Sequence, residues 1–166
     1  EYTRLLRNEA EKELKMISAG MKKFGIVPRS FVFPRNRVAH LNLLEKYGYE
    51  CYRSYGNLTS DCMYIEKRGL LYDVHPSLYL CQGARLIFLK KILDIAISKR
   101  LPLHLWCHLW NFGEKTDFKY GIINKVLSPF LKYAVEKVKE DMLSFETMLS
   151  ASLKVESSLK NEVSSS

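Results

Sequence analysis

The sequence predicts an α/β fold in which short strands alternate with helices. Apolar residues recur every three or four positions in several long segments, which is typical of amphipathic helices. Short apolar runs between these segments indicate strands. Alternation of the two kinds of segment favours βα units with parallel strands. A closed eight-unit barrel needs roughly 200 residues or more. Since the chain has 166 residues, we expect either a small open sheet or part of a barrel.

The first half of the chain is predicted to form two helix–strand pairs. Apolar positions over residues 6–24 define one face of a helix, and Gly25 is a typical helix-ending residue. The short apolar run 31–33 is closed by Pro34 and indicates a buried strand. The next two elements are expected at residues 38–47, a helix ended by Gly48, and at residues 49–52, a strand.

The second half repeats the alternation and then becomes helical. Its predicted elements are a strand at 70–72, a helix at 86–100 and a strand at 103–107. Basic residues at the end of the 86–100 helix suit a helix C-terminus. A C-terminal helix is expected over residues 126–150, followed by a Ser-rich flexible tail over 151–166. Residues 1–125 are then the α/β part of the chain.

The formal net charge of +8 permits binding to nucleic acid, an anionic glycan or an anionic surface. Lys and Arg are spread along the chain, however, and usually lie beside Glu, as over residues 11–13 and 136–140. This pattern favours a dispersed charged surface, and a dedicated polyanion site is the alternative. No helix-turn-helix, zinc-finger or RNA-binding signature accompanies the charge, so no nucleic-acid partner is expected. No apolar run approaches the roughly 18 residues of a membrane span.

The four cysteines are Cys51, Cys62, Cys81 and Cys107, and none forms a CxxC pair. Each lies among apolar or aromatic neighbours, which suits small buried thiols. Reduced structural cysteines are therefore favoured over disulfides or metal ligands. Reduced thiols in turn favour an intracellular, cytoplasmic protein, although nothing else in the sequence indicates a compartment.

The segment Leu103–Asn111 carries the densest set of chemically useful side chains. On a strand, alternation places His104, Trp106 and His108 on one face. Four residues of strand span about 13 Å at roughly 3.3 Å each. Since ligands of one zinc ion lie within about 2 Å of it, the two histidines are not expected to share a metal. His104 is expected to pack in the core. His108, where the strand ends, is either structural or a proton donor.

A second segment places polar residues just after the strand at 31–33. Arg35 could orient a carboxylate or bind an anionic intermediate. Asn36 could equally cap the helix that follows, and His40 is interpreted as a surface or packing residue. His75 lies beside Asp73 in an expected loop and is assigned no role.

Two segments together resemble the polysaccharide deacetylase family, whose members share the NodB-homology fold. Ser30 to Arg53, SFVFPRNRVAHLNLLEKYGYECYR, is similar to the family's strand–helix–strand with the motif that ends in Pro and Arg. Leu103 to Asn111, LHLWCHLWN, is similar to its late strand motif, written HLWxHPxN in one branch. The helix start Asn8-Glu9-Ala10-Glu11 also fits. The similarity runs from about Glu1 to Gly121, with Leu109 in place of the usual Pro.

The resemblance implies the C-terminal part of an incomplete (β/α) barrel. It also implies metal-dependent hydrolysis of an N- or O-acetyl group on an acetylated glycan. In that family a divalent metal, expected to be zinc, is held by one Asp and two His, and a second Asp acts as base. Those residues would precede Glu1, so this chain is expected to hold no metal ligand.

By the same resemblance Arg35 would orient the catalytic carboxylate and His108 would be the general acid. Trp106, Trp110 and Asn111 would contact the sugar. The family's Asp-containing motif between the two segments has no clear equivalent, and Asp73 fits it poorly. The chain alone is therefore expected to be inactive, as part of a carbohydrate deacetylase. The alternative is a glycan-binding or degenerate module that kept the fold without the chemistry.

Overall fold

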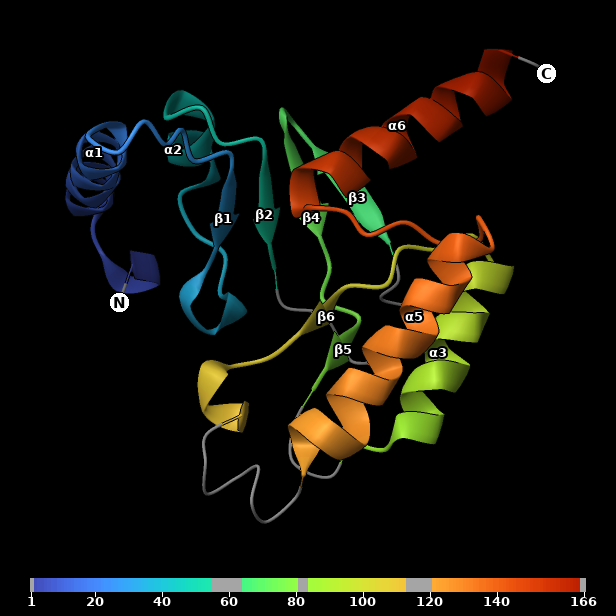
Figure 1. The fold of residues 1–166 in the computed structure, drawn as a ribbon. Helices are drawn as coiled ribbons and strands as arrows, with labels where there is room; N and C mark the ends of the chain where they lie inside the picture. The colour runs from blue at the N-terminus through green and yellow to red at the C-terminus, as the bar shows by residue number, and fades with distance from the viewer. Residues whose placement is uncertain (1, 55–63, 81–83, 113–120, 165–166) are drawn as a thin grey trace. The chain divides into compact units, whose positions relative to one another are not determined.

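The computed structural model describes residues 2–54, 64–80, 84–112 and 121–164. The chain divides into two compact units (Figure 1). Unit 1 takes residues Glu1–Gly56, Ile65–His75 and Glu146–Ser166, and unit 2 takes Asn57–Tyr64 and Pro76–Phe145. Each unit is a mixed α/β structure with its own small sheet. No barrel is present in the part of the chain that is described.

Unit 1 is built on a four-stranded sheet with the order β1-β2-β4-β3. The β1–β2 and β2–β4 pairs are parallel, whereas β3 and β4 form an antiparallel pair. The strands are β1 (Ser30–Val32), β2 (Cys51–Arg53), β3 (Ile65–Arg68) and β4 (Leu71–Val74). The helices are α1 (Arg7–Lys22), α2 (Leu41–Lys46) and α6 (Met148–Ser164), with short 3-10 turns η1 (Tyr2–Arg4) and η2 (Pro34–Asn36).

The core of unit 1 forms where the predicted apolar faces meet. Its largest cluster contains Ala10 and Leu14 of α1, Leu43 and Leu44 of α2, and Leu71 of β4. Four aromatic residues complete this cluster, namely Tyr2, Phe33, Tyr49 and Tyr52. A smaller cluster of Cys51, Tyr72 and Val74 is covered by Met148 and Leu149 of α6. Helix α6 thus closes the side of the sheet that α1 and α2 leave open.

Unit 2 pairs two very short parallel strands, β5 (Leu78–Tyr79) and β6 (Leu105–Trp106). Helix α3 (Leu86–Ser98) follows β5, and the 3-10 turn η4 (Leu109–Phe112) follows β6. A π-helical segment, η5 (Ile122–Leu127), leads directly into helix α5 (Ser128–Lys139). Leu89 and Leu93 of α3 pack with Ile122 and Phe130 to form the core of this unit.

The structure confirms the predicted alternation of helices with parallel strands. Gly25 and Gly48, predicted to end helices, follow α1 and α2 with φ values of 69° and 78°. Glycine adopts this left-handed conformation without the steric cost that a Cβ atom imposes. The antiparallel strand β3 is an addition that the sequence did not predict. Asn36 does not cap α2, because His40 precedes that helix and the Asn36 side chain binds Arg53 instead.

The C-terminal region differs from the single helix at 126–150 and flexible tail at 151–166 that the sequence predicted. Helix α5 ends at Lys139, close to Asp141, whose φ is 55°. Helix α6 then begins at Met148, after a reciprocal cap between Thr147 and Ser150. The Ser150 amide donates to Thr147 Oγ1 at 3.1 Å, and the Thr147 amide donates to Ser150 Oγ at 2.8 Å. Polar Ser and Thr here start a helix.

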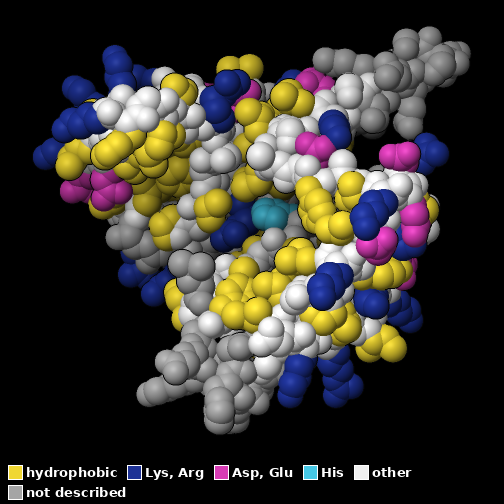
Figure 2. Space-filling view, in the orientation of Figure 1, with side chains coloured by type: hydrophobic (Ala, Val, Ile, Leu, Met, Phe, Trp, Pro, Cys, Tyr) yellow, Lys and Arg dark blue, Asp and Glu magenta, His cyan; other side chains and the backbone are white. Residues whose placement is uncertain are grey.

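Charged side chains are dispersed over the face seen in Figure 2, with Asp and Glu among Lys and Arg. Ion pairs within unit 1 join Arg29 to Glu50 and Lys46 to Glu11. In unit 2, Lys139 Nζ lies 2.9 Å from a Glu136 carboxylate oxygen. Such exposed pairs are screened by solvent and contribute little to stability. None of the described helices is both long enough and apolar enough to cross a membrane.

Strong alkali should destabilise unit 1, because three buried groups resist losing their protons. Burial raises the pKa of Cys51 from 9.0 to about 11 and that of Tyr2 from 10.0 to about 12. Burial, and next the Asp73 carboxylate, raise the pKa of Tyr52. The unfolded thiol and phenol ionise first, so the folded state binds more protons above pH 9. These groups therefore leave the free energy of unfolding unchanged below pH 9 and lower it as the pH rises from 9 toward 11 to 12.

Each group contributes at most about 1.4 kcal/mol per pH unit inside its own window. Urea unfolding at pH 8, 9, 10 and 11 measures the loss. The variant Cys51→Ala should show a smaller decline between pH 9 and 10 than the wild-type chain. Equal free energies of unfolding at pH 8 and pH 11 would contradict the burial of these groups.

Candidate functional site

An aromatic–histidine cluster of Tyr79, Trp106, His108, Trp110 and Asn111 forms at the end of strand β6 in unit 2. The Tyr79 and Trp106 rings stack with centroids 4.3 Å apart. The His108 imidazole meets the edge of Trp106 at 5.3 Å and stacks on Trp110 at 3.8 Å, with 14° between the planes. Trp106 and His108 thus lie on one side of the strand, as alternation predicted, and His108 lies just past the strand end.

Asn111 fixes the backbone turn that carries His108. The backbone amide of His108 donates to Asn111 Oδ1 at 2.8 Å, and the Asn111 amide donates to the His108 carbonyl at 2.9 Å. Tyr79 Oη also donates to Asn111 Oδ1, at 3.2 Å. Asn111 is only 4% exposed, so its side-chain oxygen is committed to these bonds. Its position therefore favours holding the turn over the direct sugar contact that the resemblance implied.

The cluster combines a flat apolar surface with a proton-transfer group. Trp110 is 67% exposed and offers a ring face to solvent. Aromatic faces bury the apolar side of a flat ligand at low entropic cost, because the side chain has only two rotatable bonds. The His108 imidazole lies between two indoles, and imidazole is a common general acid or base. This arrangement could hold a ring-shaped ligand and protonate a leaving group on it.

His104 lies just before β6 and anchors the two strands through its backbone. Its amide donates to Ser77 Oγ at 3.1 Å, and its carbonyl accepts from the Ser77 amide at 3.0 Å. In the chain, His104 directly precedes the strand Leu105–Trp106 and His108 comes two residues after its end. Within the described ranges no group of three or more His, Cys, Asp or Glu side chains could hold a metal ion. These residues alone do not fit a zinc site.

Arg35, the other predicted catalytic residue, lies in unit 1, where it lines an open cavity of about 650 Å³. We call it the strand-end cavity. Its other lining residues are Asn36, Arg37, Val38, Ser54, Arg68, Asp73 and His75. Arg35, Ser54 and His75 each follow the carboxyl end of a parallel strand, β1, β2 and β4 in turn. Ligands of open α/β sheets commonly bind at this edge.

Three side chains form a buried polar row along one wall of this cavity. Ser54 Oγ lies 3.4 Å from His75 Nδ1, and His75 Nε2 lies 3.5 Å from Asp73 Oδ2. Arg68 Nε approaches the same carboxylate oxygen at 3.7 Å. Asp73 is 1% exposed and His75 6% exposed. A buried carboxylate is costly unless it is paired, and Arg68 and His75 supply basic groups to Asp73 at these two distances.

The turn that carries Arg35 is conformationally strained. Arg35 and Asn36 have φ values of 55° and 54°, in the left-handed region that non-glycine residues avoid. Each such residue costs roughly 1–2 kcal/mol. The hydrogen bond from Arg53 Nε to Asn36 Oδ1, at 2.9 Å, helps hold the turn in place. Strained backbone of this kind is concentrated at binding and catalytic sites.

Sequence reasoning missed Ser54, Asp73 and His75 as a group. Asp73 and His75 are two residues apart, so they share one face of β4 and its extension. Ser54 directly follows β2, which pairs in parallel with β4. The available signal was therefore an Asp-x-His pair at the end of a buried strand. Two remaining cysteines, Cys62 and Cys81, lie outside the described residues, while Cys51 is buried and Cys107 exposed.

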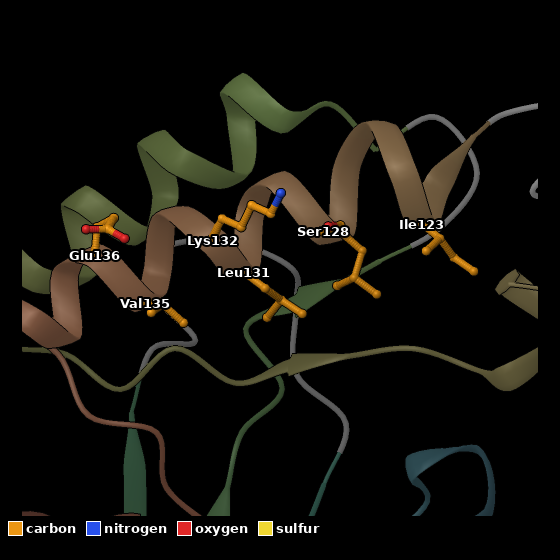
Figure 3. A pocket seen from close by; sticks show the side chains of 7 residues that line it. Ile123, Ser128, Leu131, Lys132, Val135 and Glu136 are labelled. Atoms are coloured by element: carbon orange, nitrogen blue, oxygen red, sulfur yellow. The ribbon is translucent and has the colours of Figure 1, made fainter.

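A second hollow, of about 360 Å³, lies on the helical face of unit 2 (Figure 3). Its floor is apolar, with Ile123, Leu131 and Val135 pointing to the same side of the helix, and Lys132 and Glu136 mark its rim. Among the described residues that line it there is no histidine, cysteine or aromatic side chain. A site for sugar binding or proton transfer is better supported at the aromatic–histidine cluster.

A scan against protein-family models, a search of curated proteins and a search of solved structures each returned no match to this chain. The class that the structure itself defines is a mixed α/β protein of two units with small, mostly parallel sheets.

Proposed function

We propose that this chain is part of a metal-dependent polysaccharide deacetylase, which hydrolyses N- or O-acetyl groups on a glycan. The observation that carries the proposal is the stacking of His108 on the exposed Trp110, at 3.8 Å, beyond the end of β6. This stacking brings together Trp106, His108 and Trp110, three of the residues that the family resemblance singled out, in a cluster suited to a sugar ring. The described structure establishes a mixed α/β fold. The incomplete barrel is part of the proposal.

In this proposal the chain's residues have distinct tasks. Trp106 and Trp110 bind the sugar face, and Asn111 positions the turn. His108 donates a proton to the leaving amine or alcohol as the C–N or C–O bond of the acetyl group breaks. Arg35 would orient a catalytic carboxylate. The divalent metal, by resemblance zinc, would be held outside the described residues and would activate the attacking water.

A glycan-binding module without hydrolysis is the second candidate, because the exposed Trp110 ring suits a sugar face whether or not hydrolysis follows. Incubating the full-length protein and zinc with an acetylated oligosaccharide separates the two. Release of acetate that chelation abolishes supports the deacetylase. Binding of the oligosaccharide without acetate release supports the module, and no binding at all contradicts both.

Replacing Trp110 by alanine should weaken binding of an acetylated oligosaccharide about tenfold, or ~1.4 kcal/mol, because a stacking surface is lost. The melting temperature should change little, since Trp110 is 67% exposed. Titration followed by tryptophan fluorescence or calorimetry measures the affinity. Trp110→Phe should keep most of it. The matched control is Phe24→Ala, an aromatic residue 80% exposed in unit 1; equal effects of the two alanine variants would contradict the assignment.

A further inference from the structure

The strand-end cavity of unit 1 brings a hydroxyl, an imidazole and a carboxylate into one row. Ser54 Oγ lies 3.4 Å from His75 Nδ1, and His75 Nε2 lies 3.5 Å from Asp73 Oδ2. The two ring nitrogens of His75 therefore face different neighbours, the serine on one side and the carboxylate on the other. This is the order in which a serine, a base and a carboxylate act together in nucleophilic catalysis.

A single tautomer of His75 serves both contacts. With the ring proton on Nε2, that proton faces Asp73 Oδ2, and the lone pair of Nδ1 faces the Ser54 hydroxyl. A carboxylate beside the far nitrogen holds the imidazole in the tautomer that accepts the serine proton. The same carboxylate stabilises the imidazolium that forms when the proton is transferred.

The sheet of unit 1 fixes the spacing of the three side chains. Asp73 belongs to β4, and His75 directly follows that strand, two residues on and therefore on the same face. Ser54 directly follows β2, and the parallel pairing of β2 with β4 sets Tyr52 opposite Asp73. Asp73 is 1% exposed, and Ser54 and His75 are each 6% exposed. Side chains held by packed strands keep the geometry that a reacting group needs.

The row is open to a ligand through the cavity. Ser54, His75 and Asp73 all line this space of about 650 Å³. Since Ser54 is nearly buried, we expect a small acyl group to reach its hydroxyl more readily than a bulky one. Arg68 Nε also approaches Asp73 Oδ2, at 3.7 Å, but donates to Glu66 Oε2 at the shorter distance of 3.1 Å. The carboxylate therefore remains beside the imidazole as its nearest acidic group.

We propose that Ser54 is a nucleophile that accepts an acetyl or similarly small acyl group from an ester. His75 is its general base, and Asp73 is a positioning residue that acts through His75. The proposal concerns unit 1 and does not depend on deacetylation at the aromatic–histidine cluster.

The proposed reaction has two balanced halves. Ser54 Oγ forms a bond to the acyl carbon, and the hydroxyl proton passes to His75 Nδ1. The bond from the acyl carbon to the leaving oxygen breaks, and that oxygen takes the proton and departs as an alcohol. Water then attacks the Ser54 ester and gives its proton to His75. The acid is released as Ser54 Oγ takes that proton back, so the reaction consumes one water and needs no other reactant.

Labelling with methanesulfonyl fluoride, a small reagent that reacts with activated serine hydroxyls, tests the nucleophile. The full chain is treated in the presence of EDTA, and peptide mapping by mass spectrometry locates the modified residue. Ser54 should be labelled roughly 10²-fold faster than Ser98 or more, since a positioned general base supplies about 10²–10⁴-fold. Ser98 is the matched control, because it is exposed and its hydroxyl donates to the Ile95 carbonyl at 3.0 Å.

Variants assign the role of each residue in the hydrolysis of p-nitrophenyl acetate, also measured in EDTA. Ser54→Ala should reduce hydrolysis to the uncatalysed rate, whereas Ser98→Ala should leave it unchanged. His75→Gln should slow both labelling and hydrolysis by roughly 10²–10⁴-fold. Asp73→Asn should lower kcat several-fold with little change in KM, because the carboxylate acts on the base and not on the ester. Circular dichroism checks folding, and Ser54→Ala, which removes one oxygen, keeps the test decisive if a buried charged or ring variant unfolds.

Three results would overturn the proposal. One is labelling of Ser54 no faster than that of Ser98. Another is unchanged ester hydrolysis in the folded Ser54→Ala variant, and the third is an unchanged rate of Ser54 labelling in folded His75→Gln. Release of acetate from an oligosaccharide that chelation abolishes bears on the proposed function alone. Because hydrolysis through Ser54 persists in EDTA, the two proposals fail separately.

Discussion

Replacing His108 by alanine in the full-length protein is expected to lower kcat for deacetylation by roughly 10²–10⁴-fold, the usual range for a lost general acid. The imidazole stacks on Trp110 at 3.8 Å and meets the edge of Trp106 at 5.3 Å, so its position is defined by two indoles. KM should change much less than kcat, because the proton is needed mainly in the transition state.

The control for this prediction is His104→Ala. His104 precedes β6, and its backbone holds Ser77 and Leu78 of the neighbouring strand segment. Truncating its side chain should act on stability and leave kcat of the folded protein near normal. Steady-state release of acetate, with thermal melting of both variants, separates the two effects. A near-normal kcat for a folded His108→Ala variant would remove His108 from the mechanism and weaken the family resemblance with it.

The parts of the fold that were predictable are those in which local chemistry determines the conformation. Glycine at positions 25 and 48 predicted two helix ends, since the left-handed conformation there needs no Cβ atom. The apolar spacing typical of amphipathic helices predicted a helix at 86–100, and the structure buries Leu89 and Leu93 on one face of it. Strand β3 was missed because its residues Ile65–Arg68 are three-quarters charged and carry no apolar alternation.

Part of the site was predictable for a similar reason. Alternation along a strand places Trp106 and His108 on one side whatever the rest of the fold does. The grouping of Ser54 with His75 depends instead on the pairing of β2 with β4, which are separated by about twenty residues of sequence. No periodicity within one segment contains that information. The role of Asn111 likewise required knowledge of its bond to Tyr79, 32 residues earlier.

The largest loss of stability is expected from truncation of Phe33, the residue that directly follows β1 and precedes the strained turn. Phe33 is 1% exposed. Its ring lies 4.9 Å from that of Phe31, 5.8 Å from that of Tyr52 and 6.0 Å from that of Tyr2. Phe33→Ala should lower the free energy of unfolding by about 3–5 kcal/mol, the sum of lost burial and the cavity left behind.

A loss of that size is a large share of the total stability of roughly 5–15 kcal/mol that a typical protein has, so a graded series is needed. Phe33→Leu keeps most of the volume and should cost no more than about 1.5 kcal/mol. The neighbouring Val32 is 48% exposed, and Val32→Ala should cost less than Phe33→Leu. Urea unfolding of the three variants gives the order directly. A loss for Phe33→Ala no greater than that for Val32→Ala would show that Phe33 does not lie in the core.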